Sequence, residues 1–454
     1  MHSHAFDRMR RRHYNFRMQL HPVEIGRSED AYHYGRPISI APAARRRHLA
    51  VFGGSGSGKS TLFRNMLAGD IAAGHGVTVV DPHGQLVEEI LENHIPRHRT
   101  NDVIYFNPKD QERAFALNML DCRRADQRGL VVSNVIGIFK KLWIDSWGPR
   151  MEDILRNGLY ALIEQPRPVS ILALPKLLTN QTYRKQVLSN VRNPAILDFF
   201  RNTYDRWQNS FREEAISPVL NKCRAFTTDP LIRAVIGQTR SSFDFREALD
   251  NRKVILCDLS KGAIGADNAM LLGSLIVMQE KLAALSRGDI PESERVPHLL
   301  FAEEAQNYIG DFESILSETR KFNLAIAIAT QAIDSLSRET ATAIFTNAAN
   351  LITFRVSNTD AERLKDEFTM LFPGAIIQDL PDYKAWVRTL ICDDNGCRPA
   401  EPERVATYPP YSKDPGTEWR SRVERTSNER YTKPRVAVEE KLSRFLLGDM
   451  REKE

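Results

Sequence analysis

The sequence predicts an α/β fold, a mostly parallel sheet flanked by helices, with an all-α domain inserted into it. Short apolar strands alternate with helices over residues 48–119 and again over 248–397, a pattern typical of parallel sheets. Between these stretches, residues 120–247 show helical periodicity without clear strands. A glycine-rich turn between the first strand and the next helix is a third indication, because such turns bind phosphate in α/β proteins.

The composition is that of an ordinary globular protein. Of 454 residues, 42% are hydrophobic and 27% are charged, which excludes collagen-like, disordered and disulfide-scaffold classes. The segment that comes nearest to a membrane helix, residues 271–278, is far shorter than the ~18 residues required. The polar, basic N-terminus does not resemble a secretory signal. We therefore expect a cytoplasmic protein without an intrinsic membrane anchor.

The charge is mildly basic. The net charge is +5, and 46 of the 63 basic residues are Arg. Arg suits phosphate recognition because its planar fork binds two oxygens at once. A GC-rich genome would give the same excess, so this observation alone does not identify a polyanionic partner.

The elements expected for the α/β core follow one another in a regular order. Its strands are expected at residues 49–52, 77–80, 103–106, 253–259, 298–302, 324–329 and 350–355. Its main helices are expected at residues 58–68, 85–93 and 267–286. Together they assign residues 48–119 and 248–397 to one core.

Three further segments complete the expected organisation. Residues 1–47, with extended stretches at 14–19 and 37–41, predict a short β-rich basic segment. Residues 398–454 predict a polar tail that ends in an amphipathic helix at 436–447. The inserted all-α domain, 120–247, is expected to contain helices at 131–142, 151–164, 175–188, 195–204 and 211–226.

The glycine-rich turn fits the pattern G-x-x-x-x-G-K-[ST] at every position, and its place between a strand and a helix is the context that confirms this motif. Backbone N–H groups of the turn would bind phosphates, Lys59 would reach the β- and γ-phosphates, and Ser60 would offer its hydroxyl to Mg²⁺. The alternative is a chance Gly/Ser-rich turn. The residues predicted to bind ATP are Gly53, Gly54, Ser55, Gly56, Ser57, Gly58, Lys59, Ser60 and Thr61.

A second motif favours motor ATPases among P-loop proteins. Residues 297–304 form an apolar strand that ends in Glu303 and Glu304. Motor ATPases need one acidic group near Mg²⁺ and one near the attacking water, and successive residues at a strand end can reach both. We predict Glu303 as a Mg²⁺ ligand and Glu304 as the catalytic base. The alternative is a solvated acidic strand end.

Two other P-loop classes are disfavoured. A GTPase needs Asn-Lys-x-Asp to read guanine, but residues 221–224 place Arg224 where Asp belongs. The transporter signature Leu-Ser-Gly-Gly-Gln does not occur, which disfavours the ABC class.

Three polar side chains are further candidates for catalysis. Gln331 follows the strand at 324–329 and is predicted to sense the γ-phosphate; alternatively it caps a helix beginning at Ile333. Arg320, at a helix end, is predicted to be an arginine finger acting in a neighbouring subunit; alternatively it complements the helix dipole. Arg355 is the second candidate for this finger, and its alternative role is to pair with Asp360 or Glu362.

Cysteine and histidine give no metal site. Cys392 and Cys397 flank an Asn-Gly turn signal, which predicts a hairpin with the two thiols near each other. One such pair is too few for zinc, which takes four ligands. His94 and His98 are separated by Pro96, which argues against a shared helical face.

In this order the motifs resemble the HerA/FtsK superfamily of DNA-pumping P-loop ATPases, and most closely the conjugative coupling proteins (TraG/TraD group) of type IV secretion. The motifs that carry the resemblance are the P-loop, Asp81-Pro82-His83-Gly84, the helical insertion, Glu303-Glu304, Thr319-Arg320-Lys321, Ala329-Thr330-Gln331 and Phe354-Arg355-Val356-Ser357. The resemblance covers about residues 45–370. Two departures are the missing membrane anchor and a Glu at the first acidic position, where the family usually has Asp.

The resemblance implies a RecA-like core, a homo-hexameric ring, ATP with Mg²⁺ bound between subunits, DNA in the central channel and Arg320 acting in trans. The leading hypothesis is an ATP-driven DNA translocase of a mobile element, with a relaxase or secretion channel as partner. The alternatives are a secretion-type ATPase that moves protein, and a HerA-like ATPase that works with a nuclease in defence or repair.

Two segments are candidates for contact with DNA phosphates. The loop 260–266 follows a strand end and is rich in small residues, and Lys261 adds a positive charge to it. The insertion offers an aromatic between cations, which could stack on an unpaired base. The alternatives are a solvated lysine and a core tryptophan. The residues of the insertion concerned are Arg201, Arg206, Trp207 and Arg212.

Overall fold

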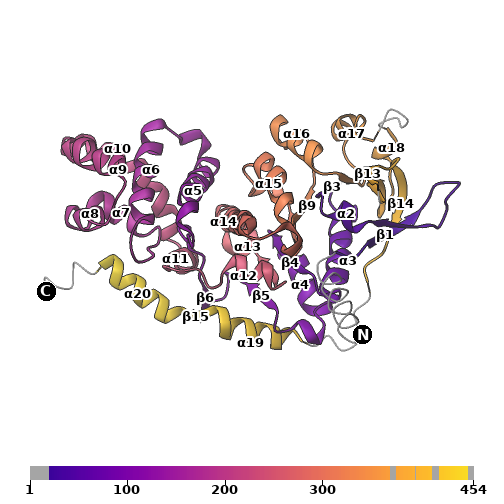
Figure 1. The fold of residues 1–454 in the computed structure, drawn as a ribbon, viewed down its shortest axis with the longest axis horizontal. Coiled ribbons are helices and arrows are strands. Elements are labelled where there is room, and N and C mark those ends of the chain that lie inside the picture. Colours follow the sequence, from indigo (N-terminus) through magenta and orange to yellow (C-terminus); the bar gives the residue numbers. More distant parts are fainter. Residues whose placement is uncertain (1–19, 369–374, 394, 412–418, 448–454) are drawn as a thin grey trace, which may run out of the picture. The chain divides into compact units, whose positions relative to one another are not determined.

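The computed structural model describes residues 20–368, 375–393, 395–411 and 419–447, and Figure 1 shows its ribbon. The stretch expected at 14–19 lies outside the described residues. The chain divides into two compact units. Unit 1 comprises Met1–Phe106, Phe245–Ser260 and Ala283–Ser427. Unit 2 comprises Asn107–Asp244, Lys261–Leu282 and Asn428–Glu454.

Unit 1 is built on an 11-stranded sheet. In spatial order its strands are β2 (Pro37–Ile40), β1 (Val23–Ser28), β14 (Glu403–Thr407), β11 (Lys384–Arg388), β10 (Asn350–Thr353), β3 (Leu49–Phe52), β9 (Leu324–Thr330), β8 (His298–Glu303), β4 (Gly76–Asp81), β7 (Val254–Asp258) and β5 (Val103–Phe106). All neighbours from β10 to β5 are parallel. Antiparallel pairs join β11, β14, β1 and β2 to that block. The predicted mostly parallel sheet is confirmed.

The parallel strands form the centre of the core because helices cover both faces of the sheet. In Figure 1, α15 and α16 lie on one side of the strands, and α3 and α4 lie on the other. Every residue of β3, β8 and β9 is buried, as expected for apolar runs in a parallel sheet. The helices of unit 1 are α2 (Pro42–Arg45), α3 (Lys59–Ala72), α4 (Gln85–Asn93), α12 (Phe245–Asp250), α15 (Phe312–Thr319), α16 (Arg338–Asn347), α17 (Asn358–Leu364) and α18 (Ala375–Gln378).

The antiparallel extension of the sheet differs from the sequence prediction. β1 belongs to the segment expected to stand apart at 1–47, and β14 belongs to the expected polar tail, yet the two strands pair, with Gly26 opposite Thr407. β14 in turn pairs with β11. These strands were missed because pairing over hundreds of residues leaves no local pattern. In β14 only two residues are buried.

Unit 2 is mainly helical and has wider limits than the predicted insertion 120–247. It starts at Asn107 and also takes in Lys261–Leu282 and Asn428–Glu454. The expected helix 175–188 is two helices, because Asn180 accepts a hydrogen bond from the backbone N–H of Tyr183 and caps the second one. The expected helix 195–204 becomes a short α-helix followed by a π-helical turn, Phe199–Thr203.

The helices of unit 2 are α5 (Arg128–Leu142), α6 (Pro149–Ile163), α7 (Ala173–Thr179), α8 (Gln181–Leu188), α9 (Pro194–Asp198), α10 (Asn209–Thr227), α11 (Pro230–Ile236), α13 (Lys261–Ile264) and α20 (Arg435–Leu447). A small two-stranded sheet joins β6 (Arg113–Phe115) to β15 (Thr432–Pro434). Two further helices, α14 (Ala266–Ser286) and α19 (Arg420–Tyr431), begin in one unit and end in the other.

The segment Ala266–Asp289, which contains α14, is long and apolar enough to cross a membrane by length and composition. The search for an uninterrupted apolar run missed this segment, because a window that also contains small and polar residues still has a mean hydropathy of 1.3. Of its most apolar window, 83% is buried, and a buried core helix meets the same criterion.

The predicted hairpin is confirmed. β12 (Leu390–Asp393) and β13 (Gly396–Pro399) pair with Cys392 opposite Cys397. A disulfide joins the two cysteines.

Candidate active site

The P-loop connects β3 to α3 at the carboxyl edge of the parallel sheet. Gly56 and Gly58 have φ of 73° and 122°, which favour glycine at these positions. A Cβ at Gly58 would lie 3.0 Å from Cε1 of Phe354 and 3.1 Å from Cδ1 of Tyr383. No side chain caps α3, so its first backbone N–H groups remain able to bind an anion.

Lys59 lies within this loop. Its Nζ donates hydrogen bonds to the carbonyl oxygens of Gly53, at 2.6 Å, and Gly54, at 2.9 Å. Desolvation lowers the pKa of Lys59, and the nearby carboxylates of Glu304 and Glu303 oppose this shift. The ammonium group is therefore poorly solvated, and the two nearby carboxylates favour its charged form, the form that binds phosphate.

The structure brings together the two residues predicted to hold Mg²⁺. Glu303 ends β8 with a 7% exposed side chain, and its carboxylate is hydrogen bonded to the Ser60 hydroxyl. Burial raises the pKa of Glu303 to about 7, and the charge of Asp81 acts in the same direction. The hydrogen bond from Ser60 and the charge of Lys59 favour the ionised form.

Glu304 lies directly after the strand in a left-handed conformation, with φ 49° and ψ 43°. A non-glycine residue rarely adopts this conformation, which costs on the order of 1–3 kcal/mol and clusters at functional sites. Its Oε2 accepts a hydrogen bond of 2.6 Å from Nε2 of Gln306. The charges of both Glu304 and Glu303 act on Lys59.

Two buried acids at the same edge were not predicted as site residues. Asp81 ends β4, is fully buried, and accepts hydrogen bonds from the backbone N–H groups of His83 and Val87. Burial raises the pKa of Asp81. Asp258 is its register partner on β7. Both residues could have been found from the sequence, because each follows a run of apolar residues predicted to form a strand.

Gln331 lies at the same edge but does not cap a helix. It follows Thr330, which pairs in register with Phe52 at the start of the P-loop. Its side chain is exposed. The alternative role at a helix beginning at Ile333 was wrong, because the next helix begins at Arg338 and is capped by Ser337.

Arg320 lies at the opposite edge of the sheet. It precedes Leu324, the first residue of β9, and this seven-residue strand ends beside the P-loop. At ~3.3 Å per residue, roughly 20 Å of strand separates the two ends. Arg320 is exposed, and desolvation together with the positive charges of Arg47 and Arg46 lowers its pKa. In the described part of the chain, no hydrogen bond or ion pair holds its guanidinium group.

Arg355, in contrast, lies beside the P-loop of its own chain. Its carbonyl oxygen accepts a 2.8 Å hydrogen bond from the backbone N–H of Gly54. Its guanidinium group donates to Asp382 at 2.8 Å and to the carbonyl oxygen of Leu380 at 3.4 Å. The expected alternative partners, Asp360 and Glu362, were therefore wrong.

The two candidate DNA-binding segments differ from expectation. Residues expected as a loop at 260–266 include a helical turn, α13, and Lys261 is partly exposed at its start. Trp207 packs against Tyr204, Phe199 and Phe211, with ring centroids 5.3, 6.3 and 5.3 Å away. The contacts with Phe199 and Phe211 are edge-on, the contact with Tyr204 is tilted, and Trp207 is partly exposed. Trp207 therefore belongs to an aromatic cluster but is not a fully buried core residue.

The cations around this tryptophan are partly engaged. Arg212 donates to Asn209 and to the carbonyl oxygen of Trp207. Arg206 donates to Asn202 at 3.1 Å. Arg201 is exposed.

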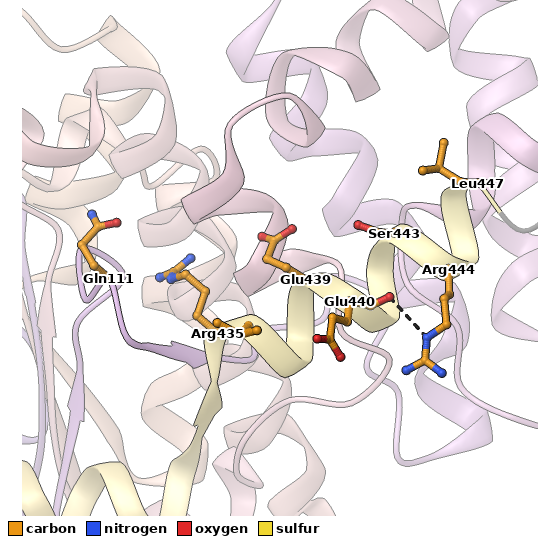
Figure 2. Close-up of a pocket in the computed structure, with 8 residues that line it drawn as sticks. Gln111, Arg435, Glu439, Glu440, Ser443, Arg444 and Leu447 are labelled. Atoms are coloured by element: carbon orange, nitrogen blue, oxygen red, sulfur yellow. Dashed lines mark hydrogen bonds between the residues drawn. The ribbon is translucent and has the colours of Figure 1, made fainter.

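Unit 2 contains a pocket of about 960 Å³ along α20. Figure 2 shows its lining, in which the Nε of Arg444 donates to the carbonyl oxygen of Glu440. Glu439 is engaged by Arg233, and Arg435 by backbone carbonyl oxygens. The charges are of both signs and none of the predicted site residues lines it, so the pocket is not part of the phosphate-binding site.

Comparisons with known proteins agree with this geometry. Residues 23–346 match the family described as Helicase HerA, central domain. No curated protein matches the chain.

Solved structures share the fold. The plasmid coupling protein TrwB in complex with ADP and Mg²⁺ is 19% identical, with a TM-score of 0.58 over 88% of this chain and 97% of that one. TrwB in complex with an ATP analogue is 18% identical, with a TM-score of 0.56 over 88% and 94%. VirB4 of Thermoanaerobacter pseudethanolicus is 12% identical, with a TM-score of 0.52 over 87% and 97%. The family match covers most of the sequence, and the chain therefore belongs to the HerA helicase central-domain family of P-loop ATPases.

Proposed function

We propose that this protein hydrolyses ATP to translocate DNA, in the manner of the coupling proteins it resembles. The observation that carries the proposal is the hydrogen bond between Ser60 and Glu303 beside Lys59. It joins the phosphate-binding loop to the acidic strand end, two motifs far apart in the sequence. This pairing supports nucleotide hydrolysis over nucleotide binding alone.

Each residue has a defined part in the proposed reaction. Lys59 and the uncapped start of α3 bind the phosphates. Glu304 accepts a proton from the attacking water. Gln331, at the tip of the adjacent strand, donates a hydrogen bond to the γ-phosphate. The Glu304 carboxylate is hydrogen bonded to Gln306, whereas the Glu303 carboxylate is hydrogen bonded to Ser60.

Mg²⁺ fits the oxygen donors at this edge. Ser60 and Glu303 would hold the ion, which would neutralise charge on the phosphates. Mg²⁺ is usually bound through one or two carboxylates plus substrate phosphates. In the described ranges, no group of three or more His, Cys, Asp or Glu side chains could hold a metal ion without such a substrate.

The position of Arg320 supports assembly into a ring. Because it lies at the edge opposite its own P-loop, it can reach a bound nucleotide only in another subunit. Its neighbours Arg46 and Arg47 make the same surface cationic. The proposed homo-hexamer therefore has its nucleotide between two subunits, with Arg320 in trans.

An ATPase assay with and without nucleic acid tests the proposal. We expect single- or double-stranded DNA to stimulate hydrolysis, with Lys59→Ala as the inactive control. Stimulation by a protein substrate alone would favour the secretion-type alternative, since VirB4 shares the fold. Activity that requires a nuclease partner would favour a role in defence or repair. A relaxase or secretion-channel partner and a cytoplasmic location are further parts of the proposal, and they are tested by binding and fractionation experiments.

A further inference from the structure

Tyr383 is fixed against the P-loop by its backbone. Its N–H donates a 2.9 Å hydrogen bond to the carbonyl oxygen of Ser57. Its carbonyl oxygen accepts 2.9 Å hydrogen bonds from both the backbone N–H and the hydroxyl of Thr407. The turn before β11 is therefore attached on one side to the phosphate-binding loop and on the other to β14.

The backbone at Tyr383 is left-handed, with φ 63°. A bulky residue in this conformation is a genuine outlier, and Gly or Asn would ordinarily occupy it. The conformation is held in place by the three hydrogen bonds and fixes the direction of the aromatic ring.

The ring of Tyr383 contacts the phosphate-binding loop but is not buried by that contact. Cδ1 of Tyr383 would be 3.1 Å from a Cβ at Gly58. The residue is nevertheless 43% exposed. One edge of the ring thus closes the loop at Gly58, while much of its surface is open to a ligand.

The order of strands decides which part of a nucleotide the ring can meet. The P-loop follows β3; β9 and β8, with Gln331 and Glu303, lie on one side of it, and β10 and β11 lie on the other. Lys59 and Ser60 face the acids, so the terminal phosphates lie on the acidic side. The ribose and base of the same nucleotide then extend toward Tyr383, where Arg355 and Asp382 form an exposed ion pair.

We propose that the ring of Tyr383 is the stacking platform for the base of the bound nucleotide. The inference rests on the proposed nucleotide-binding function and assigns the base-binding part of that site. Because every base presents a π-face, stacking is tolerant of base identity, so adenine and guanine nucleotides should both use it.

The test separates base binding from phosphate binding. Tyr383→Asn removes the ring but tolerates the left-handed backbone. We expect calorimetry to show roughly 5- to 150-fold weaker ADP and GDP binding, the loss of one base–aromatic stack, and unchanged binding of pyrophosphate. Tyr383→Phe should keep wild-type affinity for ADP. Tyr32→Asn, at a 93% exposed aromatic, is the matched control and should change nothing.

Three outcomes are distinguishable. Wild-type ADP affinity in Tyr383→Asn, or an equal loss of pyrophosphate binding, would overturn the stacking role while leaving the proposed ATPase intact. Failure of the wild-type protein to bind ADP would instead overturn the proposed function. Should Tyr383→Asn not fold, Tyr383→Trp retains a ring, and its added fluorescence should be quenched by ADP but not by pyrophosphate; equal quenching by both, or by neither, contradicts the proposal.

Discussion

The two edges of the parallel sheet in unit 1 carry opposite charge. At the carboxyl edge, three strands end in the buried acids Asp258, Asp81 and Glu303. At the amino edge stand the arginines Arg46, Arg47 and Arg320. One chain therefore presents a phosphate cradle on one edge and a group of cations on the other. In the proposed ring, a second copy of the chain would bring the two kinds of group together.

Each edge also contains a buried titratable group, and the two groups can be compared. Burial raises the pKa of Glu303 at the carboxyl edge to about 7. At the amino edge, burial lowers the pKa of His48 to about 4. Both edges thus favour the neutral form of a buried side chain. They differ in what surrounds it: Glu303 has the cation Lys59 beside it, whereas His48 is hydrogen bonded to the main chain of Leu316 and Ile326.

Removing the amino-edge cation should have the largest effect. Arg320→Ala is expected to lower kcat by about 10³- to 10⁵-fold, the range for an arginine finger. Lys321→Ala, at the next residue, should retain activity. In mixtures, Arg320→Ala subunits should poison wild-type subunits, and Lys59→Ala subunits should partly complement them. Full activity of a dilute monomer would contradict the two-edge arrangement.

The second-largest effect is expected from neutralising Glu304, the proposed catalytic base at the carboxyl edge. Glu304→Gln should lower kcat by roughly 10²- to 10⁴-fold, the range for general-base catalysis, because the amide cannot take a proton from water. Nucleotide binding should persist, since the P-loop contacts remain. Calorimetry for binding and a phosphate-release assay for turnover measure the two effects separately. Turnover at the wild-type rate would remove Glu304 from the reaction.

The third test is pH-dependent stability at the amino edge. The pKa of His48 is lowered in the folded state, so its stabilising contribution is present above pH ~6.5 and is lost as the pH falls through about 4. The contribution is on the order of 3 kcal/mol. Urea unfolding between pH 7 and 4 should show a smaller pH dependence in His48→Gln than in wild type. His33→Gln, at an exposed histidine, should behave as wild type; His75 titrates in the same window and will leave a residual slope.

The smallest expected effect concerns DNA and a cation that follows the carboxyl end of β7, Lys261. If Lys261 contacts one phosphate, Lys261→Ala should weaken binding to all DNA sequences alike and reduce the log–log salt slope by about one unit. Lys185→Ala, at an exposed lysine of α8, is the control. An unchanged slope and affinity would remove Lys261 from the DNA path and direct attention to the other cations of unit 2.

The carboxyl edge was far more predictable than the amino edge. The P-loop pattern and the strand ending in Glu303 are local signals, and their meeting follows from the rule that parallel strands end at one edge. The sequence showed that Asp81 ends a strand, but no second motif linked this residue to the nucleotide site. The grouping of Arg320 with Arg46 and Arg47 depends on which strands are neighbours, and no local pattern contains that information.

The pairing of β11, β14 and β1 was unpredictable for the same reason. The position of Tyr383 beside the P-loop depends on this pairing and was therefore missed. Its backbone is held by Ser57 and by Thr407, residues distant from it in the sequence. Short strands with half-exposed residues give weak alternation. A left-handed tyrosine also contradicts turn propensities, which assign this position to Gly or Asn.

The pairing of β1 with β14 also has a consequence for synthesis. β1 emerges from the ribosome early, but its partner is completed only at residue 407. Until then the nascent chain can offer β1 only β2 as a neighbour, and its other edge stays open to wrong partners, a known hazard of unpaired strands. The hairpin of β1 and β2 can therefore join the rest of the sheet only after β14 has been synthesised.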